Sequence, residues 1–264
     1  MNFNLLKIEE TNSIYDIILN DPKKQNTLSE EMINELQSAL KNGETNKKIN
    51  VILISSTGKV FSAGHNLKDL NSKRDEKDKG KEYYKRIFKL CSELMININN
   101  CTKPIIAVID GIATAAGCQL ISSCDLAYSS SSAKFATPGV NIGLFCSTPM
   151  VAISRNLSNK HSMEMLLTGE LISSDKASKI GLINDVVEKS TLKDFVLNKA
   201  QKISKKSSVT LKIGKKAFYK QLDMKLPDAY DYASKVMAQN MLKLDAKEGI
   251  DAFIDKREPK WKDR

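Results

Sequence analysis

The pattern of apolar and polar positions divides the chain into a part with strands and helices, followed by a purely helical part. Residues 13–20 (SIYDIILN) alternate as a strand does, and 49–56 (INVILISS) is short and β-branched, which is typical of a buried strand. Between them, 27–42 has the periodicity of an amphipathic helix that is capped near Ser29. Strands that alternate with helices predict an α/β core.

The alternation continues through the middle of the chain. Helical periodicity covers 83–100, and the Lys103-Pro104 pair ends it before an apolar strand at 104–111. A helix is expected next around the small-residue stretch AGCQLISSC. The charge density of 71–82 (NSKRDEKDKGKE) instead predicts a mobile, solvated segment that is not folded.

Beyond about residue 190, only helical patterns remain. We expect helices at 191–205, at 208–224, after Pro227 and near 245–256. The sequence therefore predicts two regions, an α/β core over 1–190 and a C-terminal helical region over 191–264.

Composition limits the partners and the setting of the protein. The chain has 41 Lys and Arg against 31 Asp and Glu, a formal charge of +10, which favours an anionic partner without choosing its class. Five cysteines without CxxC spacing indicate reduced thiols in the cytoplasm. With only two histidines, we expect no zinc site. The N-terminal stretch MNFNLLKIEE has two acids and no apolar core, so we expect neither a signal peptide nor a transit peptide, and Pro and Gly within the uncharged stretch 135–154 argue against a membrane span.

Two segments share a pattern that brings backbone N–H groups to a ligand. FSAGHNLKDL (61–70) and GIATAAGCQL (111–120) each place a Gly/Ala turn after an apolar strand and before a helix. Two such N–H groups that converge form an oxyanion hole. Either segment alone is weak evidence, because such turns also occur where a helix simply packs against a strand.

Three further motifs accompany these segments: NDPKKQNTLS, FATPGVNIGLF and LLTGELISSDKASKIGLINDVV. With them, the chain resembles the enoyl-CoA hydratase/isomerase (crotonase) superfamily from about residue 5 to 262, and one branch of it in particular through AFIDKREPKW near the C-terminus. The resemblance implies an α/β spiral of repeated ββα turns with a C-terminal helical trimerisation region. It also implies an acyl-CoA thioester as substrate, no further cofactor, and a homotrimer or a hexamer.

The resemblance places the oxyanion hole at the backbone N–H groups of His65 and Ala116, which would bind the thioester oxygen. The His65 ring need not take part, and we expect it to be exposed or satisfied by a neighbour. The residues that match the coenzyme A path are Lys24, Gln25, Asn26, Ala63 and Leu67. Lys24, Lys68, Lys256 and Lys260 are candidates to bind its 3′-phosphate.

The resemblance also shows what is missing. A hydratase of this family uses two glutamates for proton transfer, and this chain has Gln119 and Gly139 in their places. Glutamine can position a water but accepts no proton at neutral pH, and glycine has no side chain. Since one positioned acid or base contributes about a hundred- to ten-thousand-fold, hydration should be weak.

Other residues could in principle substitute for the glutamates. We interpret Asp125 as a structural carboxylate, Cys146 as a buried thiol beside Ser147, and Glu164 and Glu170 as part of a helix face and its end. The sequence does not place His161 beside Cys146.

Three functions remain open. The first is an acyl-CoA-processing enzyme that either retains weak hydration or carries out enolate chemistry that needs only the hole, such as decarboxylation of a malonyl-type thioester. The second is a non-catalytic acyl-CoA binder. The third, RNA binding through the lysines of 202–220, is not expected, because a solvated helix face explains them equally well.

Overall fold

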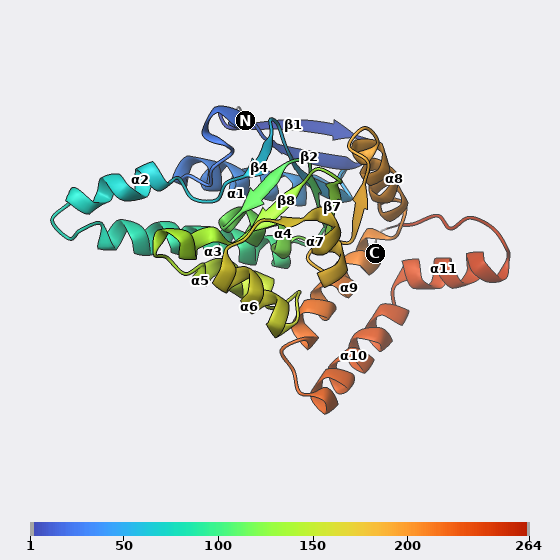
Figure 1. Ribbon diagram of the computed structural model, residues 1–264. Coiled ribbons are helices and arrows are strands. Elements are labelled where there is room, and N and C mark those ends of the chain that lie inside the picture. Colours follow the sequence, from blue (N-terminus) through green and yellow to red (C-terminus); the bar gives the residue numbers. More distant parts are fainter. Residues whose placement is uncertain (1–2, 263–264) are drawn as a thin grey trace.

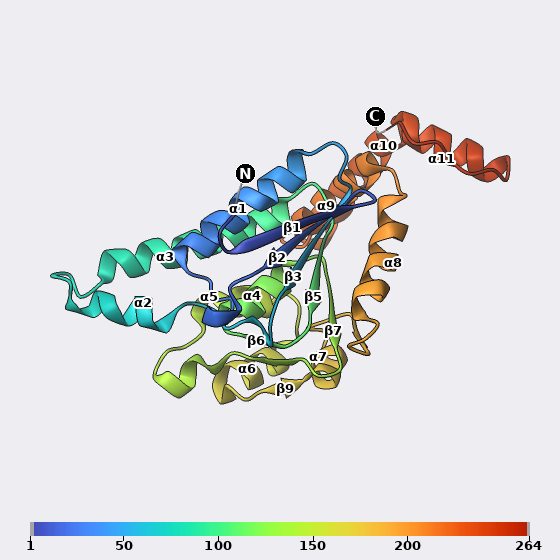
Figure 2. The same ribbon diagram turned by 90° about the horizontal axis from the view of Figure 1, so that it is seen from above.

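The computed structural model describes residues 3–262 and builds them around two sheets (Figures 1 and 2). The six-stranded sheet has the order β1-β2-β3-β5-β7-β10, and the four-stranded sheet has the order β4-β6-β8-β9. The first sheet comprises Leu6–Thr11 (β1), Ile14–Leu19 (β2), Val51–Ser56 (β3), Ile105–Ile109 (β5), Leu126–Ser130 (β7) and Asp185–Val187 (β10). The second comprises Val60–Ser62 (β4), Ile112–Thr114 (β6), Lys134–Ala136 (β8) and Ile172–Ser173 (β9).

Successive strands alternate between the two sheets, and a helix completes each turn. The chain passes from β3 to β4, from β5 to β6 and from β7 to β8, and helices follow each pair. Within each sheet these strands pair in parallel. The repeated ββα spiral that the sequence predicted is confirmed.

The helices before the C-terminal region are Glu30–Thr45 (α1), Leu67–Ser72 (α2), Lys81–Asn100 (α3), Ala116–Ser123 (α4), Ser147–Ile153 (α5), Asn159–Thr168 (α6), Ser174–Ile180 (α7) and Leu192–Ser204 (α8). Three short 3-10 helices are Pro22–Lys24 (η1), Lys73–Asp75 (η2) and Pro138–Ile142 (η3). The predicted cap of α1 is confirmed, since the Ser29 hydroxyl accepts a hydrogen bond from the Met32 N–H.

Helices cover both faces of the larger sheet, so its central strands are buried. All six residues of β2 are buried. The main core includes residues of α1, α3 and α4, and a second cluster joins Leu192, Val196 and Ala200 of α8 to the opposite face of the sheet. Because α8 packs on the sheet, the core extends past the predicted boundary at residue 190, to about residue 205.

The prediction of an unfolded segment at 71–82 is wrong. Helix α2 continues through η2, and α3 begins at Lys81, so the two form a hairpin that projects from the core (Figure 1). Two features order it. The Asp78 carboxylate accepts the N–H groups of Gly80 and Glu82 at 3.0 and 2.9 Å, and the Tyr84 hydroxyl donates to the Leu70 carbonyl oxygen at 3.0 Å.

The C-terminal helices form an arm that leaves the core. They are Ser208–Gln221 (α9), Leu226–Met241 (α10) and Leu244–Ile254 (α11), close to the predicted ranges. Neither α9 nor α10 has a buried residue, and both views show α10 and α11 pointing away from the sheets (Figures 1 and 2). No helix within residues 3–262 is long and apolar enough to cross a membrane. Residues 1, 2, 263 and 264 of the two predicted regions lie outside the described residues.

Candidate functional site

Two loops meet at one edge of the smaller sheet. Strands β4 and β6 are parallel neighbours, so the loop before α2 and the turn before α4 leave the sheet on the same side. The contact between them is close: a Cβ placed on Gly64 would lie 3.0 Å from both the Ala115 Cβ and the Ala116 nitrogen. The structure therefore brings the segments of His65 and Ala116 together.

Glycine is also required one residue further on. A Cβ on Gly117 would overlap the carbonyl oxygen of Ser62, at the end of β4. The missing side chain lets the first turn of α4 rest directly on the β4 backbone. Ala115, which precedes the helix, has a φ of 49°, a conformation that alanine rarely adopts. Strain and close packing thus fix the direction in which α4 starts.

The N–H groups of His65 and Ala116 have no acceptor within the described residues. Ala116 is the first residue of α4, and N–H groups in a first helical turn have no partner inside the helix. His65 lies in the four-residue connection between β4 and α2. Two backbone donors thus remain available beside each other, as an oxyanion hole requires.

The His65 ring is turned away from this role. Its Nδ1–H donates to the Leu28 carbonyl oxygen at 3.1 Å, and the ring meets Phe88 edge-on at 5.2 Å. Burial lowers the pKa of the imidazole, so it is neutral at pH 7. With the proton on Nδ1, Nε2 carries a lone pair, and that atom is buried without a partner in the described chain.

Gln119 is the residue that the sequence resemblance sets at the first glutamate position. It lies in the first turn of α4 with 3% exposure, and its Oε1 has no hydrogen-bond partner among the described residues. A buried amide oxygen of this kind has a strong tendency to accept a hydrogen bond from a water or a ligand. Gln119 can therefore orient a molecule here, but it cannot take up a proton.

Gly139, which the resemblance sets at the second glutamate position, has no room for a side chain. A Cβ there would lie 2.6 Å from the Leu144 carbonyl oxygen and 2.9 Å from the Cys146 Sγ. The loop after η3 closes on the glycine, so the position is filled by neighbouring atoms. The sequence showed that the carboxylate was missing but gave no sign that its space was closed.

Cys146 has the character of a buried thiol. It is 7% exposed, and burial raises its pKa above the usual value. His161 lies instead on α6, where its ring is 3.8 Å from the Glu164 carboxylate. No hydrogen bond joins His161 to Cys146 in the described part of the chain, and Ser147 donates only to the Phe145 carbonyl oxygen. These residues do not form a nucleophile and base pair.

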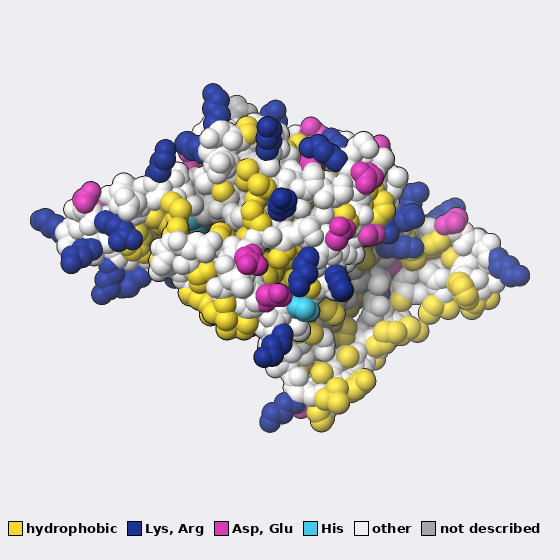
Figure 3. Space-filling view, in the orientation of Figure 1, with side chains coloured by type: hydrophobic (Ala, Val, Ile, Leu, Met, Phe, Trp, Pro, Cys, Tyr) yellow, Lys and Arg dark blue, Asp and Glu magenta, His cyan; other side chains and the backbone are white. Residues whose placement is uncertain are grey.

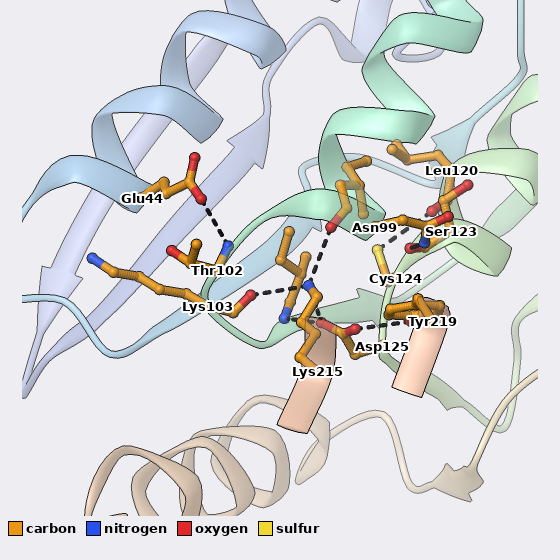
Figure 4. Close-up of polar contacts among 12 residues, drawn as sticks. Glu44, Asn99, Thr102, Lys103, Leu120, Ser123, Cys124, Asp125, Lys215 and Tyr219 are labelled. Carbon is orange, nitrogen blue, oxygen red and sulfur yellow. Dashed lines mark hydrogen bonds and ion pairs between the residues drawn. The ribbon is translucent and has the colours of Figure 1, made fainter. Parts of the chain in front are cut away.

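The carboxylate of Asp125, which follows α4, is held by hydrogen bonds within the fold (Figure 4). It accepts hydrogen bonds from the Lys215 ammonium at 2.6 Å, the Tyr219 hydroxyl at 2.9 Å and the Ile105 N–H at 2.7 Å. Lys215 also donates to two backbone carbonyl oxygens, and its side chain is 8% exposed. The network connects α9 to the core. Because Lys215 takes part in it, this residue does not belong to a solvent-exposed row of lysines within 202–220.

The loop predicted to follow coenzyme A lies against the β4 loop. Ala63 N–H donates to the Gln25 carbonyl oxygen at 3.1 Å, and Leu28 N–H donates to the Gly64 carbonyl oxygen at 2.8 Å. Lys24, Gln25, Leu67 and Lys68 are exposed beside this junction, and Ala63 is half-buried. The structure therefore groups these predicted residues along one edge of the candidate hole.

Asn26 is an exception. Its side chain does not face the predicted path of coenzyme A. It is fully buried, its Oδ1 accepts from the Asp21 N–H, and its Nδ2 donates to the carbonyl oxygens of Thr57 and Val60. Its amide shapes the loop and is not available to a ligand.

Lys256 and Lys260 are also separated from the site. They follow α11, which lies at the end of the molecule opposite to α2 in both ribbon views (Figures 1 and 2). Within one chain they do not reach the loop of Lys24. The residues that the structure describes include no cluster of acidic, cysteine or histidine side chains that could hold a metal ion.

Comparison with known proteins bears on the family and the fold of the chain. The family model for enoyl-CoA hydratase/isomerase matches residues 9–264. The chain belongs to the enoyl-CoA hydratase/isomerase family. Rat enoyl-CoA hydratase domain-containing protein 3, mitochondrial, is 44% identical over 257 residues, which are 97% of this chain and 84% of the relative.

Solved structures of this family have the same fold. The crystal structure of human enoyl-CoA hydratase domain-containing protein 3 has a TM-score of 0.93 at 43% identity, and it covers 98% of this chain and all of the other. An enoyl-CoA hydratase of Mycobacterium smegmatis has a TM-score of 0.92 at 40% identity, with 97% and 98% covered. Both the superfamily and the branch that the sequence motifs indicated are confirmed.

Proposed function

We propose that this family member binds an acyl-CoA thioester with its carbonyl oxygen between the N–H groups of His65 and Ala116. The observation that supports it is the close contact of Gly64 with Ala116, which places two donors without acceptors beside each other. Donors that are fixed before the reaction stabilise negative charge on an oxygen without reorganisation. Lys24, Gln25, Ala63, Leu67 and Lys68 would lie along the coenzyme A portion.

The chemistry that this arrangement favours needs no protein base at the acyl carbon. In decarboxylation of a malonyl-type thioester, the bond from C2 to the carboxylate breaks and its electron pair passes to C2. Carbon dioxide leaves, and the charge spreads onto the thioester oxygen in the hole. A water then donates a proton to C2, and the hydroxide that remains passes to the solvent. Gln119 would orient that water. Hydration of an enoyl thioester would be weak, because it needs a proton acceptor that Gln119 and Gly139 do not supply.

A non-catalytic acyl-CoA binder is the second candidate. Its support is the closed space at Gly139, since the binding geometry persists where the proton-transfer position is filled. RNA binding has less support. It would use the exposed lysines of 202–220, and Lys215, in the middle of that stretch, points into the protein.

Incubation with enoyl-, 3-hydroxyacyl- and malonyl-type CoA thioesters, read by mass, tests the proposal. Loss of carbon dioxide supports enolate chemistry, and unchanged thioesters that stay bound support a binder. Ala116→Pro removes the N–H of the first helical residue, and its thermal midpoint must be measured beside binding, because Ala115 before it is strained and Gly64 lies close. Ala116→Gly, which keeps the N–H, is the control. Fast hydration by the wild type would refute the role given to Gln119 and Gly139.

We also propose a homotrimer or hexamer that the C-terminal arm assembles. Large apolar side chains are exposed along it, and the space-filling view shows them as a nearly continuous band (Figure 3). They include Leu226, Tyr230, Met237, Leu242, Phe253 and Ile254. Lys256 and Lys260 would then contact the ligand of a second copy. Sedimentation of the wild type against Leu242→Glu tests this, and a monomeric wild type would contradict it.

The cytoplasmic setting stays a prediction from the sequence. The animal relatives of the branch carry the word mitochondrial in their names, so imaging of the tagged full-length protein in its own cells is the appropriate test.

A further inference from the structure

An apolar cavity of about 370 Å³ lies beside the candidate hole. One of its walls is Phe88, whose ring contacts His65, and another is formed by Ile142 and Leu144, which follow Gly139. Leu67 and Leu70 of α2 complete the apolar lining. An acyl chain that leaves a thioester in the hole would enter this space.

The polar groups of the cavity are few. Tyr84 lines it, but its hydroxyl already donates to the Leu70 carbonyl oxygen. The remaining two are the Asn71 amide and the Arg74 guanidinium, which stand three residues apart at the end of α2 and in η2. Residues at this spacing share one side of a helix, so both can address the same group.

Arg74 differs from the cations on the opposite side of the hairpin. There, Lys73 pairs with Glu76, Lys85 with Glu82, and Arg86 with Glu30. Arg74 has no ion pair in residues 3–262, although Asp75 follows it directly in the sequence. An otherwise apolar cavity thus ends in a guanidinium and an amide that both offer hydrogen-bond donors.

We propose that Asn71 and Arg74 form a subsite for a carboxylate at the far end of the acyl chain. The protein would then select mono-CoA thioesters of dicarboxylic acids over thioesters that end in a methyl group. Guanidinium and carboxylate match in shape and charge, and Asn71 adds a further donor. This inference rests on the proposed binding of the thioester in the hole.

The position of Arg74 sets the length of the preferred chain. From the helix cap at Asn66, beside the hole, to Arg74 the helical rise amounts to about 12 Å. The malonyl group of the proposed decarboxylation would not reach that far, so the subsite rests on thioester binding alone and not on that reaction. The subsite therefore fits a medium-length acyl chain, which spans the apolar cavity before its carboxylate meets Arg74.

Calorimetric titration with octanoyl-CoA and with the mono-CoA thioester of octanedioic acid tests the subsite. The two ligands differ only at the far end of the chain. We expect the wild type to bind the dicarboxylic thioester about tenfold more tightly, since the charged contact is partly exposed to water. Arg74→Gln should abolish the preference, and Arg74→Lys should retain part of it. Lys73→Gln, the neighbouring cation on the other side, is the matched control and should leave it unchanged.

A charge reversal sharpens the test. Arg74→Glu should bind 8-aminooctanoyl-CoA more tightly than the dicarboxylic thioester, and because Arg74 is exposed the variant should fold normally.

Equal affinity of the wild type for the two eight-carbon thioesters would overturn the subsite and leave thioester binding intact. Failure of the wild type to bind either one would overturn both. A smaller assembly of Arg74→Gln, seen by sedimentation, would also refute the subsite by assigning Arg74 to a contact between chains.

Discussion

The two halves of the candidate site differ in how tightly the surrounding structure specifies them. At the junction of the loops, Gly64 and Gly117 let backbone meet backbone, and two N–H groups are left without acceptors. At the two positions that the resemblance assigns to proton transfer, Gln119 has no basic side chain, and the space at Gly139 is filled by Leu144 and Cys146. Under the proposed function, the difference means that the fold maintains the geometry for thioester binding independently of groups that move protons.

The largest expected effect is a loss of stability when the ion pair between Asp125 and Lys215 is broken. Lys215→Met leaves the largely buried Asp125 carboxylate without its cation, and we expect a loss of about 3 kcal/mol in the free energy of unfolding, the lower end for a buried pair. The double variant Lys215→Met with Asp125→Asn should recover part of the loss. Chemical denaturation measures both. If Asp125 instead served as a base, Asp125→Asn would remove turnover while leaving stability close to that of the wild type.

The second-largest expected effect is a change in activity when a carboxylate is introduced at position 119. Gln119→Glu places a base at the position that the resemblance assigns to one, and we expect enoyl-CoA hydration to rise about a hundredfold, the lower end for one positioned group. Product mass measures the change. If hydration does not increase in a variant that still binds thioesters, the missing base at position 119 is not what limits hydration.

Gly139→Glu provides the contrasting case. The added side chain would displace the Leu144 carbonyl and the Cys146 thiol, so we expect no gain in hydration and a loss of stability of about 1–3 kcal/mol. A rise in activity at this position would mean that the loop opens easily and that the space is not closed.

Close packing of the binding half predicts a cost at Gly117. Gly117→Ala should destabilise the protein by about 2 kcal/mol and weaken thioester binding, because α4 must move off the Ser62 carbonyl. Gly214, in the middle of α9, has open space around its Cα, so Gly214→Ala should stabilise by about 0.5–1 kcal/mol. Equal thermal midpoints for the two variants would contradict the requirement for glycine at 117.

The smallest expected effect is the contribution of His65 to the pH dependence of stability. Burial lowers the pKa of His65 below its ordinary value of 6.5, so the unfolded chain binds the proton more readily. The stabilising contribution is present above pH 6.5 and is lost as the pH falls through the folded-state pKa. His65→Gln should reduce the loss of stability between pH 7 and pH 5, and His161→Gln should not. The same slope in both variants would exclude His65 as its source.

Much of this arrangement follows from local sequence. The Ser29 cap, the β-branched strand at 51–56 and the C-terminal helices were predictable, because each depends on nearby residues. The two donor loops were predictable from their Gly/Ala turns and from the family resemblance. The hairpin of α2 and α3 was missed, since its order depends on the Asp78 cap and on the bond from Tyr84 to Leu70.

Contacts between distant residues were the main limit. Nothing near Gly139 in the sequence reveals that Leu144 and Cys146 fold back onto it, and nothing near Lys215 names Asp125 as its partner. The inward amide of Asn26 was missed for the same reason, since it binds the carbonyls of Thr57 and Val60 across the fold.

The most direct test of thioester binding by the two N–H groups is the infrared carbonyl stretch of an acyl-CoA labelled with ¹³C at the thioester carbonyl. Two backbone donors should polarise the bond, so the stretch should shift to lower frequency on binding. In Ala116→Pro it should return toward the solution value, whereas Ala116→Gly should keep the shift. A thioester that binds with an unshifted carbonyl stretch would contradict the oxyanion hole at His65 and Ala116.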